Sequence, residues 1–148
     1  MKHLYTKALL GGALISVVPA FIVTLLSNIL PATQSQNLEV VNDIFSVETY
    51  GILQYFMLFS IIVLSPIIEE VIFRGVLWNF MKKFLKEKTV YIVISVLFAV
   101  IHMDLLHVLG LLPVSFLLGW FKYKTGNIKA SLVCHISNNL VACIIMMV

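Results

Sequence analysis

The chain has 148 residues, of which 61% are apolar and 11% are charged, and its mean hydropathy is +1.05. Soluble globular domains contain about one half apolar and about one quarter charged residues, so this composition excludes that class. We therefore expect a protein of the lipid bilayer. Its net charge of +3 indicates membrane topology rather than nucleic-acid binding.

Five apolar runs approach the length of a membrane-spanning helix, which needs about 20 residues at a rise of about 1.5 Å per residue. They are Ala8–Leu30, Tyr50 to about Met81, Val90 to about Met103, Val108–Phe121 and Ala130–Val148. We predict an all-α, polytopic membrane helix bundle of about five transmembrane helices. Residues 1–49 would form an N-terminal helix and an external loop, and residues 50–148 the functional core.

The second run is too long for one perpendicular crossing. Its helical pattern continues past Ile68 through two glutamates and an arginine before it ends near Met81. Tilt, a kink at Pro66 or a cytoplasmic extension can absorb the excess length. The run therefore carries ionisable side chains into or beside the bilayer.

The lysines predict the orientation of the chain. They are Lys2, Lys7, Lys82, Lys83, Lys86, Lys88, Lys122, Lys124 and Lys129. With five spans, all of them fall on one side of the membrane, whereas residues 31–49 carry acidic residues and no basic ones. Because cytoplasmic loops are enriched in lysine and arginine, we predict a multi-pass cell-membrane protein with a cytoplasmic N-terminus and an external C-terminus.

The two cysteines, Cys134 and Cys143, lie nine residues apart on one predicted helix. This spacing allows neither an intrahelical disulfide nor a metal site, so we expect buried free thiols. Cys134 precedes His135, but neighbours on a helix diverge by about 100° and cannot pair as nucleophile and base.

Polar side chains inside the predicted spans are the feature that points to function, because each ionisable group there costs about 2.5–3.5 kcal/mol on insertion scales. They are Glu69, Glu70, Arg74, His102, Asp104, His107, His135, Asn138 and Asn139. Helical rise places Glu69 and His102 at about 17–18 Å from the cytoplasmic ends of their spans. His135 and Asn139 lie at about 9 and 15 Å by the same rule. Three helices thus bring polar groups to similar depths.

The spacing of these polar residues along their helices is compatible with a single site. Glu70 and Arg74 are four residues apart and can pair, and His135 and Asn139 share a face in the same way. Adjacent Glu69 and Glu70 diverge, so one can act in chemistry while the other binds Arg74. These groups can stabilise helix packing, activate a water by general base catalysis, or, as one glutamate and two histidines, bind zinc.

At these residues the sequence resembles the CPBP family of intramembrane proteases, the CAAX prenyl protease type II and bacteriocin-processing (Abi) family. Residues Glu69–Arg74 match its EExxxR motif, Phe98–His102 its FxxxH motif and His135–Asn139 its HxxxN motif. The resemblance covers about Gly51 to Val148. It implies an all-helical membrane endopeptidase, a hydrolase that acts on a peptide or membrane-protein substrate in the lipid bilayer.

The resemblance also implies roles for the motif residues. Glu69 and His102 would activate water, and His135 and Asn139 would stabilise the oxyanion, although Asn138 can compete with Asn139. The supporting residues would be Glu70, Arg74 and Phe98. His107 fits an interfacial histidine better than a ligand. We expect no metal requirement, while the alternative that Glu69, His102 and His135 bind zinc, as in a metalloprotease, stays open.

Three functions are compatible with the sequence. The first is an endopeptidase that cleaves a membrane-associated or secreted peptide. The second is a bacteriocin immunity or self-protection protein of the same family, with or without proteolysis. The third is a non-enzymatic membrane scaffold that keeps the motif residues for packing. The chain has lost none of the motif residues, which favours an active enzyme.

Overall fold

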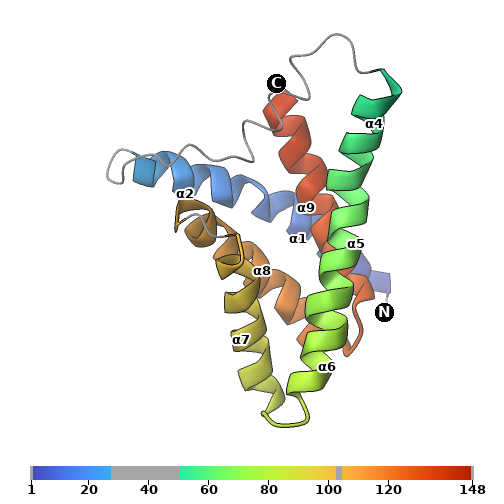
Figure 1. Ribbon diagram of the computed structural model, residues 1–148, viewed down its shortest axis with the longest axis vertical. Coiled ribbons are helices and arrows are strands. Elements are labelled where there is room, and N and C mark those ends of the chain that lie inside the picture. Colours follow the sequence, from blue (N-terminus) through green and yellow to red (C-terminus); the bar gives the residue numbers. More distant parts are fainter. Residues whose placement is uncertain (1, 28–50, 103–104, 148) are drawn as a thin grey trace.

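The computed structural model describes residues 2–27, 51–102 and 105–147, and these residues form helices joined by short connections, with no strand among them (Figure 1). Four helical segments are long and apolar enough to cross a membrane: His3–Leu26, Ile52–Met81, Leu105–Thr125 and Lys129–Met146. A fifth helix, α7 (Glu87–Val100), has 14 residues and is shorter than a full crossing. The prediction of an all-α membrane bundle of about five helices is confirmed.

The N-terminal helix begins earlier than predicted. It consists of α1 (Lys2–Ile15) and α2 (Val17–Ser27), separated at Ser16. The Ser16 hydroxyl donates to the carbonyl of Ala13 at 2.7 Å. Such a bond back to the preceding turn often bends a helix. The predicted end of this span at Leu30 lies outside the described residues.

The second span is one continuous helical segment of 30 residues, drawn vertically in green in Figure 1. It contains α4 (Ile52–Phe59), η1 (Ser60–Leu64), α5 (Ser65–Glu70), η2 (Val71–Leu77) and α6 (Trp78–Met81), where η1 and η2 are π-helical. Pro66 has no N–H and its ring would meet the carbonyl four residues earlier in a regular α-helix. The wider η1 turn directly before it accommodates the proline within the segment, and such π-helical turns are frequent at functional sites.

The last three helices differ from the sequence prediction mainly at their ends. Helix α7 begins at Glu87 rather than Val90, and its predicted end at Met103 lies outside the described residues. Helix α8 spans Leu105–Thr125 and α9 spans Lys129–Met147. The fourth span is therefore longer than the predicted Val108–Phe121, because its polar C-terminal residues continue the helix. Gly126, with φ of 70°, then makes the turn into α9.

Small residues allow the helices to approach closely. A Cβ at Gly12 of α1 would overlap the carbonyl oxygen of Cys134 in α9, and one at Gly119 of α8 would lie 2.6 Å from Ser95 Oγ in α7. Close packing of this kind drives helix association in membranes. Helix α1 therefore packs directly against α9. A cluster joins α1, α8 and α9 through Ala8, Val114, Leu118, Phe121, Ala130 and Cys134. Both cysteines are buried and free, as predicted.

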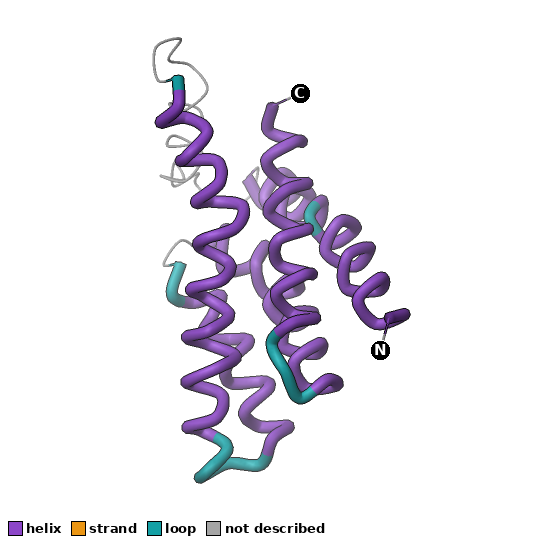
Figure 2. Tube along the Cα trace, turned by 90° about the vertical axis from the view of Figure 1, so that its right-hand side faces the viewer, coloured by secondary structure: helices purple, strands orange, loops and turns teal. Residues whose placement is uncertain are grey.

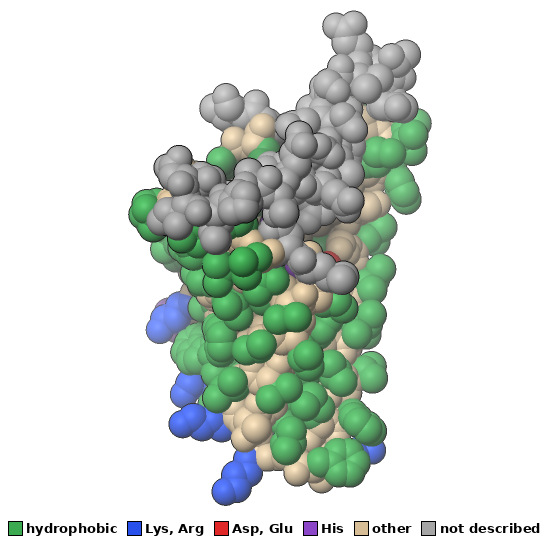
Figure 3. All heavy atoms as spheres, turned by 60° about the vertical axis from the view of Figure 1, so that its left-hand side comes forward, with side chains coloured by type: hydrophobic (Ala, Val, Ile, Leu, Met, Phe, Trp, Pro, Cys, Tyr) green, Lys and Arg blue, Asp and Glu red, His purple; other side chains and the backbone are tan. Residues whose placement is uncertain are grey.

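Basic and apolar side chains lie on different parts of the molecular surface. On the face shown in Figure 3, the basic side chains lie in the lower half, towards the end that carries the α6–α7 connection in Figure 1, and apolar side chains cover much of the rest. The basic side chains are lysines, because the one arginine of the chain, Arg74, is buried. Large apolar side chains such as Phe21, Ile52, Tyr55 and Val76 are exposed. An apolar exterior of this extent is what lipid contact requires. The protein is a multi-pass membrane protein.

The orientation leads to a labelling prediction. In a background with Cys134→Ala and Cys143→Ala, single cysteines introduced between Asn37 and Thr49 should react with an impermeant maleimide from outside intact cells. A cysteine at Lys83, in the α6–α7 connection, is the matched control and should react only after the cells are permeabilised. The reverse pattern at the two positions would invert the topology.

Candidate active site

The polar residues singled out in the sequence come together from facing helices. The α5–η2 segment carries both glutamates and Arg74, α9 carries His135 and Asn139, and α7 ends beside His102. Figure 2 shows α9, the helix that ends at the C-terminus, running beside the long vertical helix. Of these, the α5–η2 segment and α9 are separated by more than 50 residues in the sequence.

Glu70 is the centre of a buried polar network. Its Oε1 accepts hydrogen bonds from Arg74 Nη1 at 3.0 Å and from His135 Nδ1 at 3.1 Å, and its Oε2 accepts one from Ser131 Oγ at 2.5 Å. The Glu70 and Arg74 side chains are both fully buried. The predicted Glu70–Arg74 pair is present. Helix α9 supplies two further partners of Glu70, Ser131 and His135, which the sequence did not indicate.

Arg74 connects the long helix to α7 and α8. Its Nη2 donates to Ser115 Oγ at 3.1 Å, and its guanidinium carbon lies 4.1 Å from the centre of the Phe98 ring. Ser115 in turn donates to the carbonyl of Ser95 at 2.8 Å, and the Ser95 hydroxyl donates to the Ser115 carbonyl at 3.3 Å. The guanidinium is thus fixed by an ion pair, a hydroxyl and an aromatic face.

Glu69 is more accessible than its neighbour and faces the other side of the same histidine. Its side chain is 27% exposed, against 0% for Glu70. Ser65 Oγ donates to Oε1 of Glu69 at 2.5 Å, while Oε2 lies 3.6 Å from His135 Nε2. This separation is too long for a direct hydrogen bond, but a water beside the pair can bond to both atoms. His135 therefore lies between a buried carboxylate and an accessible one.

Phe98 links the two histidines of the site. Its ring centre lies 5.4 Å from that of His102 and 5.7 Å from that of His135. His102 Nδ1 is 2.9 Å from the carbonyl oxygen of Phe98. Since a carbonyl only accepts, Nδ1 carries the proton, and Nε2 of the neutral ring is left as an acceptor. Among the contacts of the described residues, His102 reaches the site through Phe98 rather than through a hydrogen bond to Glu69. Asp104 lies outside the described residues.

Asn139 is bound to the backbone of the long helix. Its Nδ2 donates to the carbonyl of Ile61 in η1 at 3.0 Å, and its Oδ1 accepts from Asn138 Nδ2 at 3.1 Å. Asn139 lies one helical turn beyond His135 on α9. One donor hydrogen of the predicted oxyanion-binding amide is therefore engaged in a contact between helices.

Four serines of this network were missed in the sequence: Ser65, Ser95, Ser115 and Ser131. Two of them could have been predicted from their spacing. Ser65 lies four residues before Glu69 and Ser131 four residues before His135, so each shares a helix face with a motif residue. Ser95 and Ser115 could not be predicted in this way. Their role depends on the contact between α7 and α8, which the sequence does not encode locally.

A catalytic zinc site needs three protein ligands close together. In the part of the chain that the structure describes, no three His, Cys, Asp or Glu side chains lie close enough together to bind a metal ion. His135 does have the carboxylate partner on its second nitrogen that metal-binding histidines usually have. However, Glu69, His102 and His135 do not converge here, so the residues do not fit a preformed zinc site.

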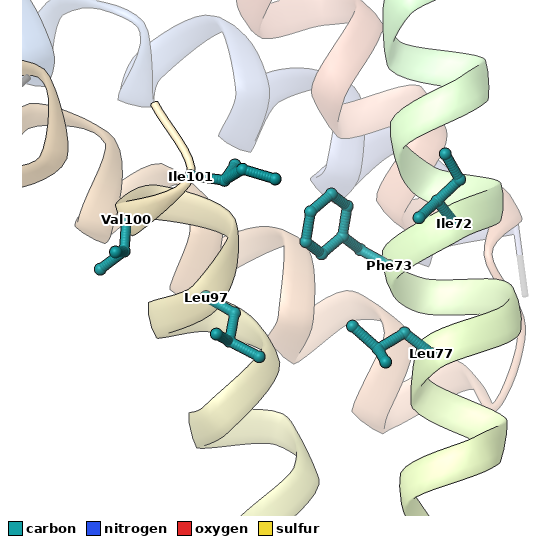
Figure 4. A pocket seen from close by; sticks show the side chains of 6 residues that line it. All are labelled: Ile72, Phe73, Leu77, Leu97, Val100 and Ile101. Carbon is teal, nitrogen blue, oxygen red and sulfur yellow. The ribbon is translucent and has the colours of Figure 1, made fainter. Parts of the chain in front are cut away.

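An apolar groove of about 440 Å³ lies beside the network (Figure 4). It is lined by Ile72, Phe73, Leu77, Leu97, Val100 and Ile101. The first three come from η2. Leu97 and Val100 come from the end of α7, and Ile101 lies between α7 and His102. Phe73 also packs edge-on against Phe98, with ring centres 5.3 Å apart. The groove is thus continuous with the aromatic side of the site.

The fold and the site define a class: a multi-pass helical membrane protein with an accessible glutamate and two histidines around a buried ion pair. A model of the family described as Type II CAAX prenyl endopeptidase Rce1-like matches residues 51–141, which include all three motifs. This match covers more than half of the chain, and the protein belongs to that family. The family is one of CAAX proteases, consistent with the CPBP resemblance of the sequence. No curated protein and no solved structure matches the chain.

Proposed function

We propose that this protein is an intramembrane endopeptidase in which Glu69 activates the water that attacks a peptide bond. The observation that supports this most directly is the arrangement of Glu69 Oε2, 3.6 Å from His135 Nε2, with the glutamate side chain 27% exposed. A general base needs a carboxylate within hydrogen-bond reach of a water. The exposed side chain of Glu69 is open to an approaching water, whereas Glu70 is buried and its carboxylate is engaged by Arg74, His135 and Ser131.

We infer the following steps for the reaction. Glu69 takes a proton from the water, the resulting hydroxide bonds to the substrate carbonyl carbon, and the carbonyl electron pair moves onto the oxygen. The resemblance implies that His102 assists Glu69 in activating the water. Because the two side chains share no hydrogen bond among the described residues, this assistance requires His102 Nε2 to approach the water bound at Glu69. His135, when its Nε2 is protonated, donates to the oxyanion. The tetrahedral intermediate then collapses, the C–N bond breaks, and Glu69 returns its proton to the leaving amine nitrogen.

Glu70 and Arg74 support this reaction without touching the substrate. By accepting from Nδ1 of His135, Glu70 fixes the ring so that Nε2 faces Glu69. Arg74 neutralises Glu70 and fixes its position. The substrate we propose is a membrane-associated peptide. The groove beside His102 is apolar, and the apolar side chains exposed on the surface around it would contact lipid.

Peptide cleavage by the purified protein in lipid nanodiscs tests the proposal. The first probe is a farnesylated peptide that ends in Cys-aliphatic-aliphatic-Ser, chosen because of the family's description. The second is the same peptide without the farnesyl group. Mass spectrometry should detect a new C-terminal fragment that is absent with Glu69→Gln protein. Cleavage of only the peptide without the farnesyl group would exclude a preference for prenylated substrates. Fragments formed equally by Glu69→Gln protein would contradict the mechanism.

Metal content gives a separate prediction. Because the candidate ligands do not converge, we expect the purified protein to contain substoichiometric zinc by mass spectrometry and to keep its activity in EDTA or 1,10-phenanthroline. One zinc per chain, with activity lost to chelation and restored by added zinc, would decide for the metalloprotease mechanism.

A further inference from the structure

The carbonyl of Ile61 lacks a backbone hydrogen-bond donor because of the π-helical turn η1 and the proline that follows it. In an α-helix it would accept from the N–H of Ser65, but that N–H bonds instead to the carbonyl of Ser60, five residues back. In the π-helical register its donor would be residue 66, which is Pro66 and has no N–H. Both helical registers therefore leave this carbonyl unsatisfied. Within a membrane an unsatisfied carbonyl costs several kcal/mol.

Asn139 supplies the missing donor from another helix. Its Nδ2 lies 3.0 Å from Ile61 O. Because a carbonyl cannot donate, this contact fixes which end of the amide faces the long helix. The bond from Asn138 Nδ2 to Asn139 Oδ1, at 3.1 Å, holds the same orientation.

Among the described residues, side-chain hydrogen bonds join α9 to the long helix at two places, of which this contact is the second. The other is made by Glu70 with Ser131 and His135. Along the long helix, Ile61 and Glu70 lie on either side of Ser65 and Glu69 in the sequence. Along α9, Asn139 follows His135 by one turn. The two hydrogen-bonded contacts therefore lie on either side of the Glu69–His135 pair, in which Oε2 and Nε2 are 3.6 Å apart.

We propose that Asn139 is a positioning residue: it satisfies the Ile61 carbonyl that Pro66 and the η1 turn leave without a partner, and so sets the distance between Glu69 and His135. The part that concerns catalysis rests on the proposed peptidase function. The part that concerns helix packing does not. This role differs from that of an oxyanion donor, which the motif resemblance implies.

A double-mutant cycle separates the two roles. Pro66→Ala restores an N–H that can bond to Ile61 O in the existing π-helical register. Asn139→Ala alone should lower the apparent Tm by about 3–5 °C and the cleavage rate by about tenfold. In the Pro66→Ala background, we expect less than half of each loss. Pro113→Ala is the matched control: it also adds an N–H within a membrane helix, but away from Ile61, and should rescue nothing.

The outcomes are distinct. An oxyanion donor would leave the Tm unchanged on Asn139→Ala and would lose the same fraction of the rate in both backgrounds, which would overturn the proposal. If Asn139→Ala protein does not accumulate, Asn139→Asp replaces it, because aspartate keeps the shape and removes the donor. Thermal unfolding needs no substrate, so the coupling between positions 66 and 139 is measurable even if no peptide is cleaved.

Discussion

Replacement of Glu69 by glutamine should lower the rate of peptide cleavage by about 10²–10⁴-fold and leave the apparent Tm of the protein near that of the wild type. Glutamine keeps the shape of the side chain, and its Oε1 can still accept from Ser65 Oγ, which bonds to Glu69 at 2.5 Å. What is lost is the carboxylate that removes a proton from water. Rates from single-turnover cleavage and Tm values from thermal unfolding in nanodiscs measure the two effects separately.

Glu87→Gln is the matched control for this substitution. Glu87 lies at the start of α7 and pairs with Lys82 at 2.8 Å, with both side chains substantially exposed. Exposed ion pairs contribute about 0–1 kcal/mol, so this variant should retain wild-type rate and Tm. Cleavage at the full rate by Glu69→Gln protein would exclude Glu69 as the base. A large fall in Tm would instead assign it to packing.

Arg74→Ala should destabilise the fold by about 3–5 kcal/mol and abolish most of the activity with it. The substitution removes the cation that pairs with Glu70 at 3.0 Å where both side chains are fully buried. Glu70 would keep its bonds to Ser131 and His135 but would remain as a buried anion without its arginine. The same change removes the bond to Ser115 and the contact with Phe98, so the attachment of α7 and α8 weakens as well.

The charge and packing parts of this loss can be separated. Arg74→Met keeps apolar volume beside Phe98 but removes the cation, and in a Glu70→Gln background no buried anion remains. We expect the loss of Tm on Arg74→Met to be clearly smaller in that background than in the wild type. Equal losses in the two backgrounds would show that the ion pair does not account for the destabilisation. Arg74→Lys should rescue only partly, because lysine lacks the planar fork that bonds to Glu70 and Ser115.

The network also explains why the site combines a buried and an accessible carboxylate. Inside a bilayer, two adjacent glutamates would repel each other unless one of them is neutralised. Arg74 neutralises the charge of Glu70. Because the two glutamate side chains diverge, Glu69 lies against Ser65 and faces Nε2 of His135. The buried carboxylate orients the histidine, and the accessible one remains available for a water.

The membrane class, the apolar runs and the residues on which the site is built could all be predicted from the amino-acid sequence. These follow from local properties: composition, runs of apolar residues and spacing along one helix. The Glu70–Arg74 pair could be predicted because residues four apart on a helix always share a face. Helix ends were predicted less well, as α8 shows, because hydropathy does not register polar residues that continue a helix beyond the bilayer core.

The sequence did not predict which helices meet or how each is rotated about its axis, and both became known from the packing of the folded chain. Glu70 lies 61 and 65 residues from its partners Ser131 and His135, and Asn139 lies 78 residues from the Ile61 carbonyl. Such contacts depend on close approaches of the kind made at Gly12 and Gly119, where a missing side chain lets one helix lie against another. Rotating a helix by one residue turns its face by about 100°, which would break these bonds without changing the hydropathy of the sequence. The physical reason is that a lipid-facing helix is apolar on nearly every side, so packing rather than composition fixes its rotation.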